Sequence, residues 1–202
     1  MKLYDGGQEP EPRRVRIFLA EKGVSVPGDP AEADAPEHRF GDDGSPEALE
    51  QTPVLELDDG TVITESLAIC RYFEGIRPQP PLFGRGGREG ALVEMWNRRV
   101  EHSLYEPVSA VLNHLDPVTA MRAEQVPARG EANRPIVLDF LERLDHELKE
   151  RLFIAGDHYT VADITALVAI DFMELARLVV PDDLVHVQRW YAQVSARPSA
   201  GA

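Results

Sequence analysis

Residues 52–74 read TPVLELDDGTVITESLAICRYFE and carry more structural information than any other part of the chain. The apolar run at residues 54–57 is typical of a strand. Asp59-Gly60 predicts a two-residue hairpin turn, because both central positions of such a turn need a positive φ. Residues 61–63 then return as a second strand, and Glu65-Ser66 stand where a helix would begin. That helix has an apolar face made of Leu67, Cys70, Tyr72 and Phe73.

This arrangement resembles the glutathione S-transferase superfamily, through Thr52-Pro53 before the hairpin and Glu65-Ser66 after it. The resemblance implies a cis bond at Thr52-Pro53, which turns the backbone of Thr52 outward to pair with a peptide ligand. It also implies that Ser66, at a helix N-terminus, holds the carboxylate of the γ-glutamyl end of glutathione. Glu65 would take the ligand's ammonium group. The alternative for these residues is a proline at a strand edge and an ordinary helix cap.

Two further passages are similar to the same family: residues 13–23 to its first helix, and residues 153–172 to its buried sixth helix. The second passage places Thr160 at the helix start and Asp163 three residues later, which is a variant of the capping box. Asp163 is therefore interpreted as structural. The resemblance implies a thioredoxin-like α/β domain over residues 1–78 and an all-α domain over residues 85–202. The proline-rich residues 76–81 mark the boundary between them.

The remaining elements follow from sequence patterns. A first strand is expected at residues 2–4 and a helix at residues 13–22, which Gly23 would end. Residues 27–46 hold many prolines and acids, and they predict no regular strand. In the second half, the apolar spacing predicts helices at residues 88–115, 135–152, 161–172 and 185–196, with a polar connection at residues 116–130.

Composition limits the function classes. The net charge of −14 argues against nucleic acid or an anionic membrane as a partner, since either needs clustered Lys and Arg. No apolar run reaches membrane-spanning length and no leader-like segment begins the chain, so a cytoplasmic protein is expected. The single Cys70 excludes an internal disulfide and a Cys-x-x-Cys redox centre. Its place on an apolar helix face favours a packing role. The six His residues lack metal-ligand spacing, so no metal is expected.

In the resembling family, a side chain in the loop before the first helix stabilises the thiolate of glutathione. Here that loop is Asp5–Pro12, and the family's donor positions fall at Gly6, Glu9 or Glu11. None of these residues carries a hydroxyl, thiol or amide. A carboxylate close to a thiol raises the pKa of the thiol, which is the reverse of what activation needs. Gln8 is the one neutral donor in the loop, and Arg13 follows close behind.

Three hypotheses follow. The first is an enzyme that no longer uses glutathione as its nucleophile and instead carries out proton chemistry on a small organic molecule. Glu9 or Glu11 would be its acid or base, in a cleft that Arg13, Gly6, Arg99, Ser103 and Tyr105 border. The second is a working glutathione S-transferase that relies on Gln8 or on backbone N–H groups. The third is a non-catalytic binding or assembly protein. The sequence favours the first, with glutathione possible but no cofactor required, and the resemblance implies a homodimer.

Overall fold

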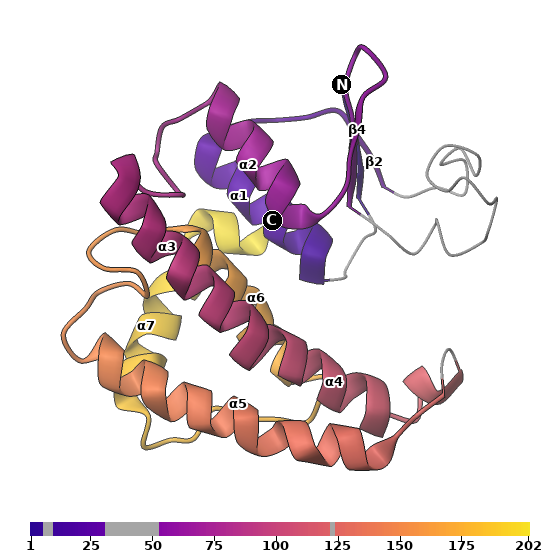
Figure 1. Ribbon diagram of the computed structural model, residues 1–202, viewed down its shortest axis with the longest axis vertical. Helices are drawn as coiled ribbons and strands as arrows, with labels where there is room; N and C mark the ends of the chain where they lie inside the picture. Colours follow the sequence, from indigo (N-terminus) through magenta and orange to yellow (C-terminus); the bar gives the residue numbers. More distant parts are fainter. Residues whose placement is uncertain (6–9, 31–52, 122–123) are drawn as a thin grey trace. The chain divides into compact units, whose positions relative to one another are not determined.

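A computed structural model describes residues 1–5, 10–30, 53–121 and 124–202 of the chain. The chain forms two compact units (Figure 1). The first consists of Met1–Pro80 with Gly201–Ala202, and the second of Pro81–Ala200. Each unit has its own apolar core, and each is described by itself below.

The first unit is built on a four-stranded sheet in the order β2-β1-β3-β4. Its strands are β1 (Lys2–Asp5), β2 (Gly28–Pro30), β3 (Val54–Glu56) and β4 (Val62–Ile63). β1 runs parallel to β2 and antiparallel to β3, and β3 runs antiparallel to β4. Leu3 lies opposite Gly28 on one side and Leu55 on the other. Leu3 and Leu55 are both buried, so the centre of the sheet is also the centre of this core.

The strand at Gly28–Pro30 corrects the sequence prediction that residues 27–46 hold no regular strand. Its position in the sheet explains why proline is tolerated. β2 is an edge strand, so one side of its backbone needs no ladder partner, and edges are where sheets accept proline. The carbonyl of Pro27 also accepts a hydrogen bond from Leu3 N at 3.3 Å, a role that requires no N–H. Residues 31–46 lie outside the described part of the chain.

The hairpin between β3 and β4 forms as predicted, but with a different turn. Leu57 N donates to Thr61 O at 2.8 Å, which leaves a loop of three residues, and Gly60 N donates to Leu57 O at 3.0 Å. Gly60 has φ 83, whereas Asp59 does not adopt a positive φ. The expected two-residue turn is therefore wrong. The loop is of the kind that closes with one glycine in the left-handed region.

Two helices, α1 (Pro10–Lys22) and α2 (Ser66–Ile76), pack against each other on one face of the sheet (Figure 1). α1 begins three residues before the expected start at residue 13. Prolines are tolerated in a first helical turn, where N–H groups have no intrahelical partner, so Pro10 and Pro12 do not delay the helix. Gly23 ends α1 at φ 60, as predicted. In the last turn, the buried Lys22 pairs with Glu74 of α2 at 2.5 Å.

The second unit is helical. It contains α3 (Gly86–Val100), a π-helical turn η2 (Glu101–Tyr105), α4 (Glu106–Leu115), the 3₁₀ turn η3 (Thr119–Met121), α5 (Pro127–Leu148), α6 (Val161–Met173), α7 (Val185–Ser195) and the 3₁₀ turn η4 (Pro198–Gly201), whose last residue belongs to the first unit. The helix expected at residues 88–115 is continuous except for the π-helical turn.

α5 begins at Pro127, eight residues before the predicted start, and Pro135 lies inside it. The N–H that would bond to the carbonyl of residue 131 is missing there. Gly130 explains how the extra turns pack. A Cβ at this position would lie 2.5 Å from Leu115 Cγ, so only glycine lets α4 and α5 approach this closely. The predicted polar connection therefore ends earlier than residue 130.

α6 forms the centre of the second unit, where all residues from Val161 to Ile170 are buried. Thr160 and Asp163 form the predicted capping box. The Asp163 carboxylate accepts hydrogen bonds from Ile154 N and Thr160 N, both at 2.9 Å, and from Thr160 Oγ1 at 3.1 Å. Trp190 Nε1 on α7 donates to the same carboxylate at 2.9 Å. The structural interpretation of Asp163 is therefore consistent with its contacts.

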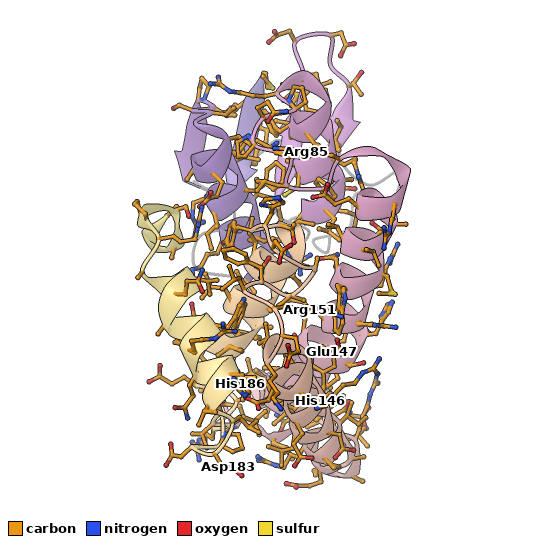
Figure 2. All side chains as sticks on the ribbon, turned by 90° about the vertical axis from the view of Figure 1, so that its left-hand side faces the viewer. Arg85, His146, Glu147, Arg151, Asp183 and His186 are labelled. Carbon is orange, nitrogen blue, oxygen red and sulfur yellow. The ribbon has the colours of Figure 1, made fainter. Side chains whose placement is uncertain are left out.

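The start of α7 is held by a residue of another helix. Asp145 on α5 accepts hydrogen bonds from the backbone N–H groups of His186 at 2.7 Å and Val187 at 2.9 Å. Figure 2 labels His186 on α7 and His146 and Glu147 on α5, the neighbours of Asp145 in sequence. Asp145 thus supplies in space the cap that α7 lacks in its own sequence, because Leu184 precedes the helix. In the described residues we find no helix with the length and apolarity to cross a membrane.

Candidate functional site

The N-terminus of α2 has an unusual backbone. Glu65, the residue before the helix, has φ 67 and ψ 118, values that residues other than glycine rarely adopt. Its carbonyl accepts the first helical hydrogen bond, from Ile69 N at 3.0 Å. Its side chain makes no capping bond to α2. Backbone strain of this kind costs about 1–3 kcal/mol and concentrates at functional sites.

Ser66 begins α2, and a guanidinium from α1 meets its hydroxyl. Arg14 is buried, and its Nη1 donates to Ser66 Oγ at 3.3 Å. The two residues are 52 positions apart in sequence, and the packing of α1 on α2 brings them together. A buried cation, a hydroxyl and the N–H groups of a helix N-terminus thus meet at one place. All three favour an anion, and their shape suits a carboxylate.

Sequence reasoning named Arg13 and missed Arg14. Arg14 stands one helical turn before Phe18, which is buried in the core, so the helical period places Arg14 on the inward face. Arg13 is the preceding residue of α1, so it points in a different direction, and it is partly exposed. The helical period could have separated the two arginines, because it places Arg14 and not Arg13 on the same face as Phe18.

The structure describes only part of the loop Asp5–Pro12. Gly6, Gln8 and Glu9 lie outside the described residues, so their proposed roles stay predictions. Glu11 was expected in the loop, but it belongs to the first turn of α1, where it is partly exposed. Pro10 and Pro12 flank it and have no N–H. In that turn, two of the first four helical positions therefore have no backbone N–H to offer.

The predicted cis bond at Thr52-Pro53 also lies outside the described residues, because Thr52 does. Pro53 itself is buried directly before β3.

Tyr4 is in the sheet, as predicted, where its hydroxyl donates to Glu56 Oε2 at 3.0 Å. Cys70 is fully buried, and burial raises its thiol pKa to about 12. The packing role expected for this residue agrees with that environment, since an inert cysteine is one that stays a thiol.

The residues expected to border a substrate cleft from the helical unit lie along α3 and η2. The Arg99 guanidinium stacks 4.8 Å from the centre of the Trp96 ring. Ser103 and Tyr105 belong to the π-helical turn, and both are partly exposed. Such turns recur at functional sites because the extra residue re-aims the side chains around it. That these residues share a cleft with Gly6 and Arg13 stays a prediction.

Comparison with known proteins identifies the family. Residues 10–76 match the glutathione S-transferase N-terminal domain, and residues 112–198 match the C-terminal domain. Glutathione S-transferase 2 of Saccharomyces cerevisiae is 35% identical over 208 residues, covering 98% of this chain and 87% of that protein. The chain therefore belongs to the glutathione S-transferase superfamily, which confirms the resemblance and the predicted fold class.

Two solved structures are similar over nearly their whole length. One is a glutathione S-transferase domain-containing protein of Marinobacter aquaeolei VT8, with a TM-score of 0.86 and 39% identity, covering 98% of this chain and 99% of that chain. The other is a class Gtt2 glutathione S-transferase of Vibrio parahaemolyticus, with a TM-score of 0.83 and 36% identity, covering 98% and 95%. These relatives favour a transferase-type enzyme over the chemistry without glutathione that the sequence had suggested.

Proposed function

We propose that this protein is a working glutathione S-transferase that joins the sulfur of glutathione to a small electrophile. The observation that carries the proposal is the contact between Arg14 and Ser66 at the N-terminus of α2, beside the strained backbone of Glu65. The names of the similar proteins support it. This is the second of the sequence hypotheses, and it replaces the first as the leading one.

The γ-glutamyl end of glutathione carries a carboxylate and an ammonium group on one carbon atom. The carboxylate fits the helix N-terminus, where the Ser66 hydroxyl, the first N–H groups of α2 and Arg14 can donate to it. The ammonium group fits the Glu65 carboxylate, whose side chain is not used for capping. The negative Glu65 and the positive Arg14 with the helix N-terminus thus complement the ammonium and the carboxylate on the same ligand carbon, which fixes the orientation of the ligand.

In the reaction, the glutathione thiol loses its proton to solvent, and the thiolate forms a bond to an electrophilic carbon. An electrophile with a leaving group, such as an aryl halide, then releases halide. The positive end of the α1 helix dipole favours a thiolate placed beside the start of that helix. The Glu11 carboxylate opposes it by like charge. Gln8 remains the proposed side-chain donor in the loop.

Binding is the first test. At a glutathione concentration 100 times its Kd, the free energy of unfolding should rise by about 2.7 kcal/mol, which visibly raises Tm. Ser66→Ala and Arg14→Lys should each reduce this rise at a fixed concentration. The matched controls are Ser25→Ala and Arg71→Lys, both exposed positions of the first unit, which should leave it unchanged.

A glutathione effect of the same size in wild type and in both site variants would contradict the proposed site. No effect at millimolar glutathione would contradict the function and return the protein to the hypothesis of chemistry without glutathione. Turnover of an aryl halide then separates binding from catalysis, since a binding or assembly protein would show the Tm rise without turnover.

A further inference from the structure

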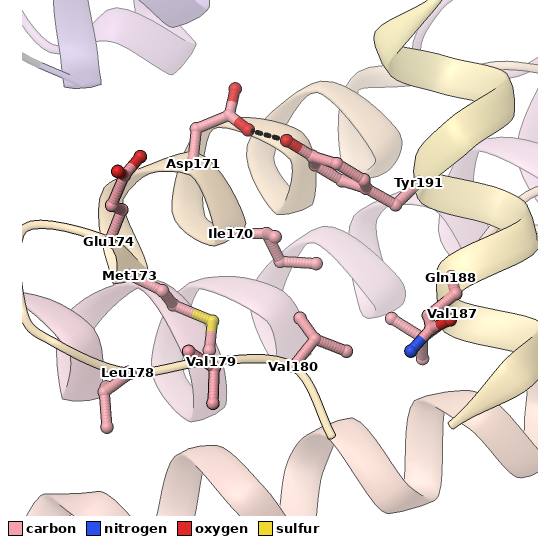
Figure 3. Close-up of a pocket in the computed structure, with 10 residues that line it drawn as sticks. All are labelled: Ile170, Asp171, Met173, Glu174, Leu178, Val179, Val180, Val187, Gln188 and Tyr191. Carbon is pink, nitrogen blue, oxygen red and sulfur yellow. Dashed lines mark hydrogen bonds between the residues drawn. The ribbon is translucent and has the colours of Figure 1, made fainter. Parts of the chain in front are cut away.

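The helical unit holds a hollow of about 530 Å³ that the glutathione site does not use. It lies between the end of α6, the start of α7 and the segment of residues 174–184 that joins them (Figure 3). A volume of this size falls within the range that binds small organic molecules. Its wall consists of Ile170, Asp171, Met173, Glu174, Leu178, Val179, Val180, Val187, Gln188 and Tyr191.

The joining segment is held at both ends, so the hollow is formed in advance. Leu178 N donates to Met173 O at 2.9 Å, immediately after Arg177 adopts φ 53. At the other end, the Pro181 carbonyl accepts hydrogen bonds from Leu184 N at 3.2 Å and from Gln188 Nε2 at 3.1 Å. The residues between these anchors form one wall of the hollow (Figure 3). A preformed wall lowers the entropic cost of binding a ligand.

The hollow is mainly apolar, and part of its apolar wall is open to solvent. Val179 is 78% exposed, which is unusual for a valine beside a cavity. Leu178, Met173 and Val187 are buried behind it and supply the deeper wall. An aliphatic or aromatic body placed here would cover Val179 and remove its side chain from water.

The charged groups of the hollow have one sign. Asp171 accepts a hydrogen bond from the Tyr191 hydroxyl at 2.5 Å, and these two side chains point toward each other across its edge (Figure 3). Glu174 is exposed on the same edge. Among the described residues that line the hollow there is no Lys, Arg or His. The nearby Arg177 lines a different hollow, of about 90 Å³, with Leu115 and Arg134.

We propose that this hollow binds small amphiphilic organic cations, with an ammonium group between Asp171 and Glu174 and an apolar body along Val179 and Val180. The Tyr191 ring adds a face that attracts cations. The net charge of −14 raises the concentration of cations near the surface. Since every lining residue lies in the helical unit, the proposal goes beyond glutathione transfer and stands without it.

Three probes that share a phenyl ring on a four-carbon chain and differ in their end group test the charge preference by isothermal titration calorimetry on the full chain at pH 7. They are 4-phenylbutylamine, 4-phenylbutan-1-ol and 4-phenylbutyrate. The amine should bind in a 1:1 ratio, and the alcohol about tenfold or more weakly, while the carboxylate should not saturate the protein. An amine that binds no better than the alcohol, or that fails to bind at millimolar concentration, would overturn the proposal.

Variants locate the site. Glu174→Gln and Asp171→Asn should each weaken amine binding roughly fivefold and leave alcohol binding unchanged. Val180→Phe, which fills the hollow, should weaken both probes. The controls are Glu150→Gln and Val118→Phe, exposed positions that do not line the hollow. If the amine binds Glu174→Gln and Val180→Phe as tightly as wild type, its site is elsewhere and the proposal is wrong.

Discussion

Glu65 combines a strained backbone with a charge that the proposed ligand needs, so stability and binding should respond in opposite directions. Glycine adopts a positive φ without strain, and Glu65→Gly should raise the free energy of unfolding by about 1 kcal/mol, after the larger entropy of an unfolded glycine is deducted. Glutathione binding should fall in the same variant. Denaturant unfolding and a glutathione titration measure the two effects.

The matched control is Thr64→Gly, at a neighbouring residue that does not have a positive φ. It should lower stability by about 0.5–1 kcal/mol, because there glycine adds only disorder to the unfolded chain. Equal destabilisation by Glu65→Gly and Thr64→Gly would mean that the conformation of Glu65 stores no strain.

Asp163 predicts a pH dependence of stability. Burial raises its pKa from 3.8 to about 6, against the opposing effect of the four hydrogen bonds it accepts. The folded protein therefore holds a proton between these two values that the unfolded chain has lost. This contribution to stability is fully present below pH 3.8 and disappears as pH rises through 6. Its size is about 3 kcal/mol.

The side chain in Asp163→Asn cannot titrate, so a comparison of wild type with this variant isolates the contribution of the Asp163 carboxyl. Wild type should exceed the variant in free energy of unfolding by more at pH 4 than at pH 7, as measured by urea denaturation at each pH. A difference that is constant, or larger at pH 7, would show that the four hydrogen bonds keep the carboxylate ionised.

At the scale of elements, the close approach of α4 and α5 depends on Gly130. The methyl group of Gly130→Ala would meet Leu115 at 2.5 Å, so we expect the free energy of unfolding to fall by about 1–3 kcal/mol. Gly87→Ala on α3 is the control. The added Cβ meets nothing within 4 Å, so the free energy of unfolding of this variant should rise by a few tenths to about 1 kcal/mol.

Leu115→Ala placed in the Gly130→Ala background should recover part of the loss, and a double-mutant cycle measures the coupling. Two losses that simply add would mean that the helices move apart freely instead of resisting the new methyl group.

Elements could be predicted where the signal was local, and were missed where the cause was tertiary. The capping box at Thr160 and the stop at Gly23 follow from neighbouring residues, and both were predicted correctly. The strand at Gly28–Pro30 exists because it pairs with β1 at a sheet edge, and no pattern in its own three residues shows this. The early start of α5 likewise depends on Gly130 meeting Leu115, which sequence spacing does not reveal.

The candidate site shows the same division between local and tertiary signals. Glu65 and Ser66 were proposed from the family resemblance and from their place at a helix start, and their role in binding stays a prediction. The partner of Ser66, Arg14, comes from another helix and was missed, because the choice between two adjacent arginines depends on which face of α1 is buried. The loop residues Gln8 and Glu9 stay predictions.

At the scale of the whole molecule, we expect a homodimer, as the family resemblance implies. Light scattering at micromolar concentration should give twice the 22.5 kDa mass of one chain. Dilution should lower the melting temperature, because dissociation removes stabilisation by mass action. A mass of one chain at all concentrations, with a constant melting temperature, would contradict this.

Because Cys70 is buried, its reaction with a thiol reagent can be used to measure local unfolding. Cys70 carries the one thiol in the sequence, and it is a fully buried residue of α2. A chromogenic thiol reagent can react with it only when that helix opens, so the labelling rate in native buffer reports the opening equilibrium of the first unit. Oxidised glutathione, in the same way, can form no mixed disulfide with the closed protein. Any response to that compound therefore reports reversible association, without the need for a cysteine-free variant.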